Sequence, residues 1–342
     1  MESILYQPDI SRMKEHTLED IAGILKKRIS RRAFSADKKL SRDQELRILS
    51  ENSQPGYFGE EHMMYILDSA KLLQEGKNIN DTLFYNWISL VQHGGEHRII
   101  KTIFKGLTYK LSGGKVFRQG ERWIPPSYLV SFVKGGLKRN DPTIFGNYEV
   151  NYGYVGAAAE FYKKTLKAKE IGINSCIHGI ITNKQVLYES IPCGNDWDIP
   201  MISPLGYSPE ELTAWEEKIR DKHCANHKIA AEMISFDCYG KRKDPGEIPG
   251  NLFNTLNWIA RGPSAGNNQP WRFYFEEGVM HMYVDLSGKK IYRERHLREL
   301  DAGIAMATVS MLEKKGTWKI LKDIEINSSS SEIYIASFDM GA

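Results

Sequence analysis

Two polar segments of the chain combine residue types that bind anions and flat polar ligands. The first is RISRRAF, in which Arg28, Arg31 and Arg32 follow an i, i+3, i+4 spacing. If the preceding helix continues through them, the three guanidinium groups share one face and repel one another unless an anion lies among them. Guanidinium forks suit phosphate, and Ser30 adds a hydroxyl if the chain leaves the helix there. The alternative is a solvated basic helix end, which the helix dipole also favours.

The second segment is GPSAGNNQPW, at positions 262–271. Its side chains are short and form hydrogen bonds, and its glycines leave the backbone accessible. Such a loop can lie beside a planar polar ligand and offer it backbone N–H and C=O groups and an asparagine amide. The alternative is a turn that only joins two elements, which is the usual role of a Pro/Gly/Asn loop.

Hydrophobic periodicity and turn residues indicate the elements that position these segments. Ser41 with Gln44 forms a capping-box pattern, and Gly172 is placed to end a helix. We expect helices over 18–29, 41–52, 153–172, 250–262 and 300–316, and strands over 63–67, 125–133, part of 199–211, 271–275, 280–286 and 331–338.

The order of elements repeats along the chain. Each half has a helix, then Gln-Pro (54–55 and 269–270), then a strand, and later a helix that opens on small residues at Gly156 or Gly303. We therefore predict an α+β fold of two related halves packed as one unit. The first half covers residues 1–230, with an insertion near 70–120, and the second covers 231–342.

The two segments together resemble the flavin-dependent nitroreductase family. Its Arg-x-Ser-x-Arg-x-Phe signature is matched from Arg28 to Phe34, and its Pro-Ser-x-x-Asn-x-Gln-Pro-Trp loop from Pro263 to Trp271. The strand that ends in Leu-Gly-Tyr at 205–207 is similar to a late strand of the family. Because the signatures lie in different halves, the chain looks like the tandem subgroup, in which one chain forms a pseudo-dimer that imitates the family dimer.

The resemblance implies FMN in a cleft between the halves. Arg28 and Ser30 would meet its phosphate and ribityl end, Ile29 would contribute its backbone, and Arg32 would lie near the pyrimidine edge. The turn from Cys176 to Gly179 would offer a backbone N–H to flavin N5. The remaining implied cofactor contacts are Lys241 and Arg242 at the phosphate, and Pro263, Ser264, Ala265 and Asn267 along the ring.

The implied activity is an NAD(P)H-linked reduction of nitroaromatic, quinone or similar flat acceptors by a ping-pong hydride mechanism. Arg32 would stabilise the reduced flavin electrostatically, and no dedicated acid or base is required. Two alternatives remain: a flavin-dependent oxidase or dehalogenase of a small metabolite or peptide, and a non-catalytic flavin-binding protein. The first-half loop ENSQPGYFG lacks Pro-Ser-x-x-Asn and the second half lacks Arg-x-Ser-x-Arg, so we expect the symmetry-related site to be inactive.

The amino-acid composition limits which kinds of binding partner the protein is expected to have. A net charge of +3 over 342 residues argues against a nucleic-acid protein, and no uninterrupted apolar run predicts a membrane span. The four cysteines form no C-x-x-C pair, so we expect reduced thiols and a cytoplasmic protein. His223 and His227 lack an evident third ligand, and we expect no metal. We expect a small-molecule substrate and a monomer, with further dimerisation possible.

Overall fold

The computed structural model describes most of both halves. The described residues are 18–31, 34–35, 38–50, 57–77, 79, 125–141, 147–179, 181, 184–191, 196–212, 216–217, 220–221, 233–235, 250–276, 278–313, 316–321 and 331–339. Most of the predicted insertion near 70–120 lies outside them. Among the described residues, no helix has the length and apolar character needed to cross a bilayer.

Every helix and strand that the sequence analysis expects is present in the expected order, and further short elements lie between them. The helices are α1 (Leu18–Lys27), α2 (Arg42–Leu49), α3 (Ser69–Gln74), α6 (Tyr152–Glu170), α7 (Gln185–Tyr188), α9 (Gly250–Ala260), α10 (Lys290–Glu294) and α11 (Leu297–Leu312). The strands are β1 (Glu60–Asp68), β2 (Ser127–Gly135), β3 (Lys138–Asp141), β4 (Tyr148–Asn151), β5 (Asn174–Ser175), β6 (Asp198–Gly206), β7 (Ile234–Ser235), β8 (Trp271–Glu276), β9 (Val279–Asp285), β10 (Thr317–Lys319) and β11 (Glu332–Asp339).

The strand order confirms an α+β fold of two like-built halves. The first sheet has the order β1-β2-β6-β5, and the second has the order β10-β11-β9-β8-β7. Read along the chain, α2-β1-β2-α6-β5-β6 is repeated as α9-β8-β9-α11-β10-β11, with the same antiparallel neighbours in each sheet. Strand β7 follows the first half but pairs with β8, in parallel. The division near residue 230 stays a prediction.

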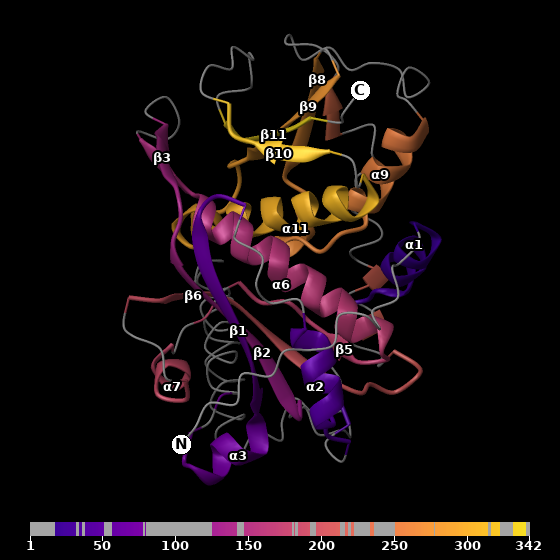
Figure 1. Ribbon diagram of the computed structural model, residues 1–342, viewed down its shortest axis with the longest axis vertical. Coiled ribbons are helices and arrows are strands. Elements are labelled where there is room, and N and C mark those ends of the chain that lie inside the picture. The colour runs from indigo at the N-terminus through magenta and orange to yellow at the C-terminus, as the bar shows by residue number, and fades with distance from the viewer. Residues whose placement is uncertain are drawn as a thin grey trace, which may run out of the picture.

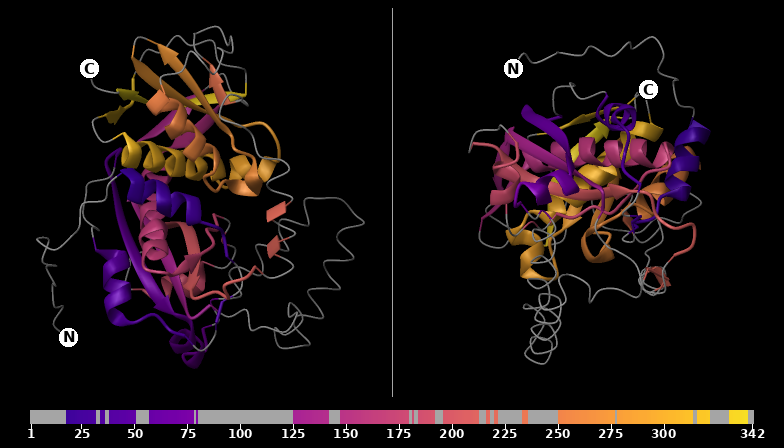
Figure 2. Two further views of the ribbon diagram at one scale, coloured as in Figure 1. Left: turned by 90° about the vertical axis from the view of Figure 1, so that its right-hand side faces the viewer. Right: turned by 90° about the horizontal axis from the view of Figure 1, so that it is seen from below.

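The helices α6 and α11 lie side by side between the two sheets (Figures 1 and 2). Gly303 brings them into backbone contact, because a Cβ there would lie 2.1 Å from the Val155 carbonyl oxygen and 2.8 Å from the Ala158 Cβ. One face of α11, with Met306 and Val309, belongs to the core of the second sheet, whereas Ile304 packs with α6 and the first sheet. The helix pair therefore joins two hydrophobic cores into one unit.

The local signals at helix ends have mixed outcomes. Ser41 and Gln44 form the predicted capping box at the start of α2. Gly172 adopts φ +83° just after α6, as a glycine that ends a helix often does. Helix α1, however, ends at Lys27, two residues before the expected position 29.

Gly303→Ala should lower the free energy of unfolding by about 3 kcal/mol, because the new methyl group cannot fit against the Val155 carbonyl unless α6 and α11 separate. Urea unfolding measures the change. The matched control is Gly23→Ala in α1, where nothing lies within 4 Å of the added methyl group and helix propensity should add about 0.5–1 kcal/mol. An unchanged midpoint for Gly303→Ala would contradict the close crossing.

Candidate functional site

The arginine segment leaves the helix before its first arginine. Ser30 forms a parallel bridge with Ser175, and the Arg31 N–H donates to the Ser175 carbonyl at 3.0 Å. The helix therefore does not continue through Arg28 and Arg31, so the condition for a shared helix face is not met; the chain pairs with β5 instead. Arg28 nevertheless remains beside Ser30, since its guanidinium donates to the Ser30 hydroxyl at 3.3 Å. Ile29 turns its side chain outward and is 42% exposed.

Arg31 has a structural role instead of facing an open anion site. Its side chain is buried, forms an ion pair with Glu216 at 3.2 Å and donates to the Glu211 carbonyl at 2.9 Å. Buried charges persist when they are paired and hydrogen-bonded in this way. Arg31 therefore fixes the segment in place. Of the described arginines in the 28–34 segment, Arg28 is the one that remains for a ligand.

Lys169, in the last turn of α6, joins this basic region, which sequence reasoning missed. Its ammonium group donates to the Asn174 side chain at 2.8 Å. Burial, followed by the positive charges of Arg31, Arg28 and Lys27, lowers the pKa of Lys169. Cations gathered this closely are destabilising unless an anion compensates them. In the sequence, Lys169 looks like any lysine at a helix C-terminus, so only the fold reveals it.

A buried tyrosine faces the same basic region. The Tyr162 hydroxyl is buried close to the Arg28 guanidinium group and the Thr308 hydroxyl. Burial raises the pKa of Tyr162, and the nearby charge of Arg28 opposes that rise. The hydroxyl therefore adds a buried polar group to the basic region beside Arg28.

The turn at 176–179 is fixed between β6 and α11. The Cys176 N–H donates to the Ser203 hydroxyl at 3.1 Å, and the His178 N–H to the Ile202 carbonyl at 2.8 Å. The Cys176 side chain is buried. Gly179 lies against the start of α11, since a Cβ there would lie 2.6 Å from Leu300 and 2.8 Å from Leu297. The Cys176 N–H is thus already engaged by protein.

The loop before β8 is held by its own side chains. The Ser264 hydroxyl accepts the Gln269 N–H at 3.0 Å, and the buried Gln269 amide donates to the Ala260 carbonyl at 2.7 Å. Asn267 and Gln269 adopt φ +55° and +45°, which is unfavourable for residues with a Cβ. Strain of this kind persists where surrounding contacts enforce it, and it gathers at ligand sites.

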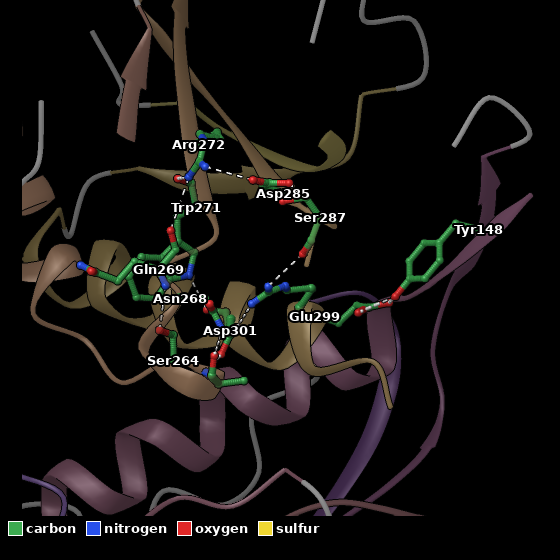
Figure 3. Close-up of polar contacts among 12 residues, drawn as sticks. Tyr148, Ser264, Asn268, Gln269, Trp271, Arg272, Asp285, Ser287, Glu299 and Asp301 are labelled. Atoms are coloured by element: carbon green, nitrogen blue, oxygen red, sulfur yellow. Dashed lines mark hydrogen bonds and ion pairs between the residues drawn. The ribbon is translucent and has the colours of Figure 1, made fainter. Parts of the chain in front are cut away.

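Asp301 in α11 holds this loop through hydrogen bonds (Figure 3). Its carboxylate accepts the Ala265 N–H at 2.8 Å and the Arg298 guanidinium at 3.3 Å, while its backbone carbonyl accepts the Trp271 indole N–H at 2.8 Å. Arg298 also lies over the Tyr292 ring, at 4.5 Å from its centroid. Burial raises the pKa of Asp301 to about 7, opposed by Arg298 and by the Ala265 N–H.

Three separate segments therefore meet around the first turns of α11. Ser30 pairs with Ser175 beside the 176–179 turn, that turn contacts Leu297 and Leu300, and the next residue, Asp301, holds the 263–267 loop. The first two segments come from the first half and the loop comes from the second. The predicted cofactor residues Arg28, Ser30, Gly179 and Ala265 thus lie along the boundary between the two halves. We call this boundary the seam.

A cavity of about 300 Å³ opens at the same seam. Its walls come from both halves, and it shares Gly179 with the predicted cofactor residues. The lining residues are Tyr154, Gly179, Ile181, Lys184, Asp198, Ile199, Pro200, Glu294, Arg295 and His296. Apart from Gly179, the sequence pattern does not single these residues out, because they gather only when the halves pack.

Several predicted residues lie outside the described part of the chain. They are Arg32, Lys241 and Arg242 from the cofactor prediction, and His223 and His227 from the metal question. Among the described residues, no cluster of three or more His, Cys, Asp or Glu side chains is arranged to hold a metal ion.

Comparison with solved structures identifies similar chains. The structure is similar over 97% of its length, and over 97% of the other chain, to a Thermotoga maritima protein provisionally assigned as a nitroreductase, with 13% identity and a TM-score of 0.48. It is similar over 58% of its length, and 92% of the other chain, to iodotyrosine deiodinase bound to FMN and 3-iodo-L-tyrosine, with 16% identity and a TM-score of 0.37.

An FMN-bound nitroreductase from Bacteroides fragilis matches 57% of this chain and 91% of its own, with 14% identity and a TM-score of 0.34. No family model matches the sequence, and no curated protein matches it either. At identities and TM-scores this low, the likenesses carry no argument about function, which rests on the residues themselves.

Asp301→Asn should flatten the dependence of stability on pH between about 4 and 7. The folded-state pKa of about 7 exceeds the unfolded value of 3.8, so the folded protein binds the extra proton and loses stability as pH rises through that window. The amide keeps the size of the side chain but does not titrate. Thermal unfolding at half-unit pH steps provides the measurement.

The matched control is Asp285→Asn in β9. Although burial opposes it, hydrogen bonds from Ser287 and the charge of Arg272 lower the pKa of Asp285. Its contribution to stability is therefore present above pH 3.8 and lost below it, so this variant should change only the acid limb. Identical slopes for Asp301→Asn and the unmodified protein between pH 5 and 7 would exclude titration of Asp301.

Proposed function

We propose that the chain is an FMN-dependent oxidoreductase that holds one flavin at the seam between its halves. The observation that carries this proposal is the convergence of segments 28–30, 176–179 and 263–267 around the first turns of α11. Those segments are far apart in the sequence, and each has a composition suited to a different part of a flavin nucleotide.

The basic region suits the phosphate end. Arg28 and the Ser30 hydroxyl offer charge-assisted and neutral hydrogen bonds, and Lys169 adds a second cation close by. The buried Tyr162 hydroxyl adds a further polar group beside Arg28. Lys241 and Arg242 remain proposed contributors to the same phosphate, and Ile29 a backbone contributor.

The loop and the turn suit the ring end. The loop presents Pro263, Ser264, Ala265 and Asn267 on a backbone that its own hydrogen bonds and Asp301 keep rigid. No hydrogen bond to a described residue engages the Gly179 N–H, which is therefore the better donor in the 176–179 turn than Cys176. Bound FMN supplies hydride and electron transfer, whereas the protein supplies position and charge. Arg32 remains the proposed electrostatic stabiliser.

The proposed electron donor is NADH or NADPH, and the proposed acceptors are flat molecules such as nitroaromatics or quinones. The fold supports a single chain acting as its own pseudo-dimer, because α6 and α11 already bury the surfaces that two subunits would share. A cytoplasmic location is part of the same proposal.

The absorbance spectrum of freshly purified protein, with its extracted cofactor identified, tests the proposal. Flavin bands that bleach with NADH or NADPH without air, and recover on addition of a quinone, are the expected result. Flavin that never reduces with nicotinamides would favour an oxidase, a dehalogenase or a non-catalytic flavin protein. Purified protein that neither contains nor takes up FMN would overturn the cofactor assignment.

Arg28→Gln should weaken FMN binding by about 10- to 100-fold, because a charge-assisted hydrogen bond to phosphate contributes about 1.5–3 kcal/mol. Riboflavin, which lacks the phosphate, should bind both proteins equally. Fluorescence titration of flavin-free protein measures both affinities. The control is Arg42→Gln, whose side chain is 74% exposed at the start of α2. Equal losses for FMN and riboflavin would place Arg28 away from the phosphate.

Lys169→Gln should have opposite effects on stability and on binding. Removing one cation from a crowded basic region raises the free energy of unfolding of flavin-free protein, and it weakens FMN binding by about threefold to tenfold. The control is Lys167→Gln in the same helix, where the lysine is paired with Glu170 at 3.0 Å. A loss of stability in flavin-free Lys169→Gln would show that the lysine is structural.

A further inference from the structure

The seam cavity has one lining cation that no described residue neutralises. Arg295 is exposed at the junction of α10 and α11, and its guanidinium group forms no hydrogen bond or ion pair with the described residues. Lys184, the other lysine or arginine of the lining, is paired with Asp198 at 2.5 Å. The charge balance of the cavity therefore depends on whether its acids are also engaged.

The lining acids all have partners. Asp198 accepts the Lys184 ammonium group and the Tyr154 hydroxyl, together with its neighbouring Ile199 N–H at 2.8 Å. Glu294 is paired with Lys290 at 2.9 Å. An entering ligand therefore meets engaged carboxylates and a guanidinium group with open donors, which favours an anion over a cation.

The aromatic side of the cavity, formed by His296 and Tyr154, is held in place by neighbouring side chains. His296 adopts φ +49° at the start of α11, and its Nδ1 lies 2.8 Å from the Glu299 carboxylate, which also accepts the Tyr148 hydroxyl at 2.9 Å. The His296 ring meets the Tyr154 ring edge-on, with centroids 5.4 Å apart. Although burial opposes it, the hydrogen bond and charge of Glu299 raise the pKa of His296. The aromatic wall is therefore held before any ligand arrives.

The remaining lining is apolar. Ile181 and Ile199 are buried, and Pro200 continues the same wall along β6. A cavity of about 300 Å³ lies at the lower end of the range for small-molecule sites, which suits one aromatic ring with a small substituent.

We propose that this cavity binds a small aromatic carboxylate, with the carboxylate on Arg295 and the ring between Tyr154, Ile181 and Ile199. This inference rests on the proposed function in one respect: Gly179 lines the cavity and belongs to the proposed flavin site, so the bound ring is the electron acceptor. For a nitrobenzoate, the nicotinamide hydride and one proton convert the nitro group to nitroso, one N–O bond breaks, and its oxygen leaves as water.

Calorimetric titration with 4-nitrobenzoate and with the neutral isostere 4-nitrobenzamide tests the site without turnover. The holoprotein should bind the carboxylate more tightly, and Arg295→Gln should weaken that binding about tenfold while leaving the amide unchanged. Arg295→Lys should fall between the two. The control, Lys289→Gln, removes an exposed cation beside α10 that does not line the cavity. Equal carboxylate affinity in Arg295→Gln and the unmodified protein would refute the site.

Flavin content and bleaching by NADH or NADPH, measured on the same samples, separate the two proposals. If carboxylate binding depends on Arg295 but the protein holds no reducible flavin, the cavity assignment is supported and the proposed oxidoreductase function is refuted. If the flavin bleaches and benzoquinone reoxidises it, but the protein neither binds nor reduces 4-nitrobenzoate, only the carboxylate site is refuted.

Discussion

The crossing of α6 and α11 is the contact on which the candidate site depends. At Gly303 the helices touch backbone to backbone, 2.1 Å from a hypothetical Cβ to the Val155 carbonyl, and side chains from both sheets close around them. Dense interiors of this kind transmit position, because neither helix can shift by an ångström without opening a void. The first turns of α11 are thereby fixed relative to β5 and β6, and the polar groups of both halves are arranged around that turn.

Those first turns are costly to bury. Arg298, Glu299 and Asp301 are each at most 3% exposed, although charged side chains seldom lie so deep. Each charge reaches a different partner: Arg298 donates to the Ser287 carbonyl, Glu299 accepts from Tyr148, and Asp301 accepts from Ala265. Buried polar networks stabilise little by themselves but strongly disfavour other arrangements. The network therefore selects one position for the 263–267 loop and one for the His296 wall.

Local signals predicted the elements, and contacts distant in the sequence decided the site. The Ser41 capping box is local, and it formed as expected. The sequence left open whether the helix continues through the arginines; it does not, because Arg31 pairs with Glu216, 185 residues away, and with β5, and periodicity can anticipate neither contact. The sequence did not reveal Lys169 or the cavity for the same reason, because both depend on contacts between distant segments. The polar loop was recognisable because its composition carries the signal, whereas Asp301, which holds the loop, resembles any acid near a helix start.

The repeat places different residues at equivalent positions in the first turns of α6 and α11. Aligning Gly156 with Gly303 places Tyr154 where the second half has Asp301. A tyrosine there has no carboxylate to hold a loop N–H, and its hydroxyl instead donates to Asp198 on β6. Tyr154 thus lines the cavity at the seam that Asp301 helps to build. One helix start therefore supports the 263–267 loop, whereas the other lines the cavity beside it, so equivalent positions of the repeat have different structural roles.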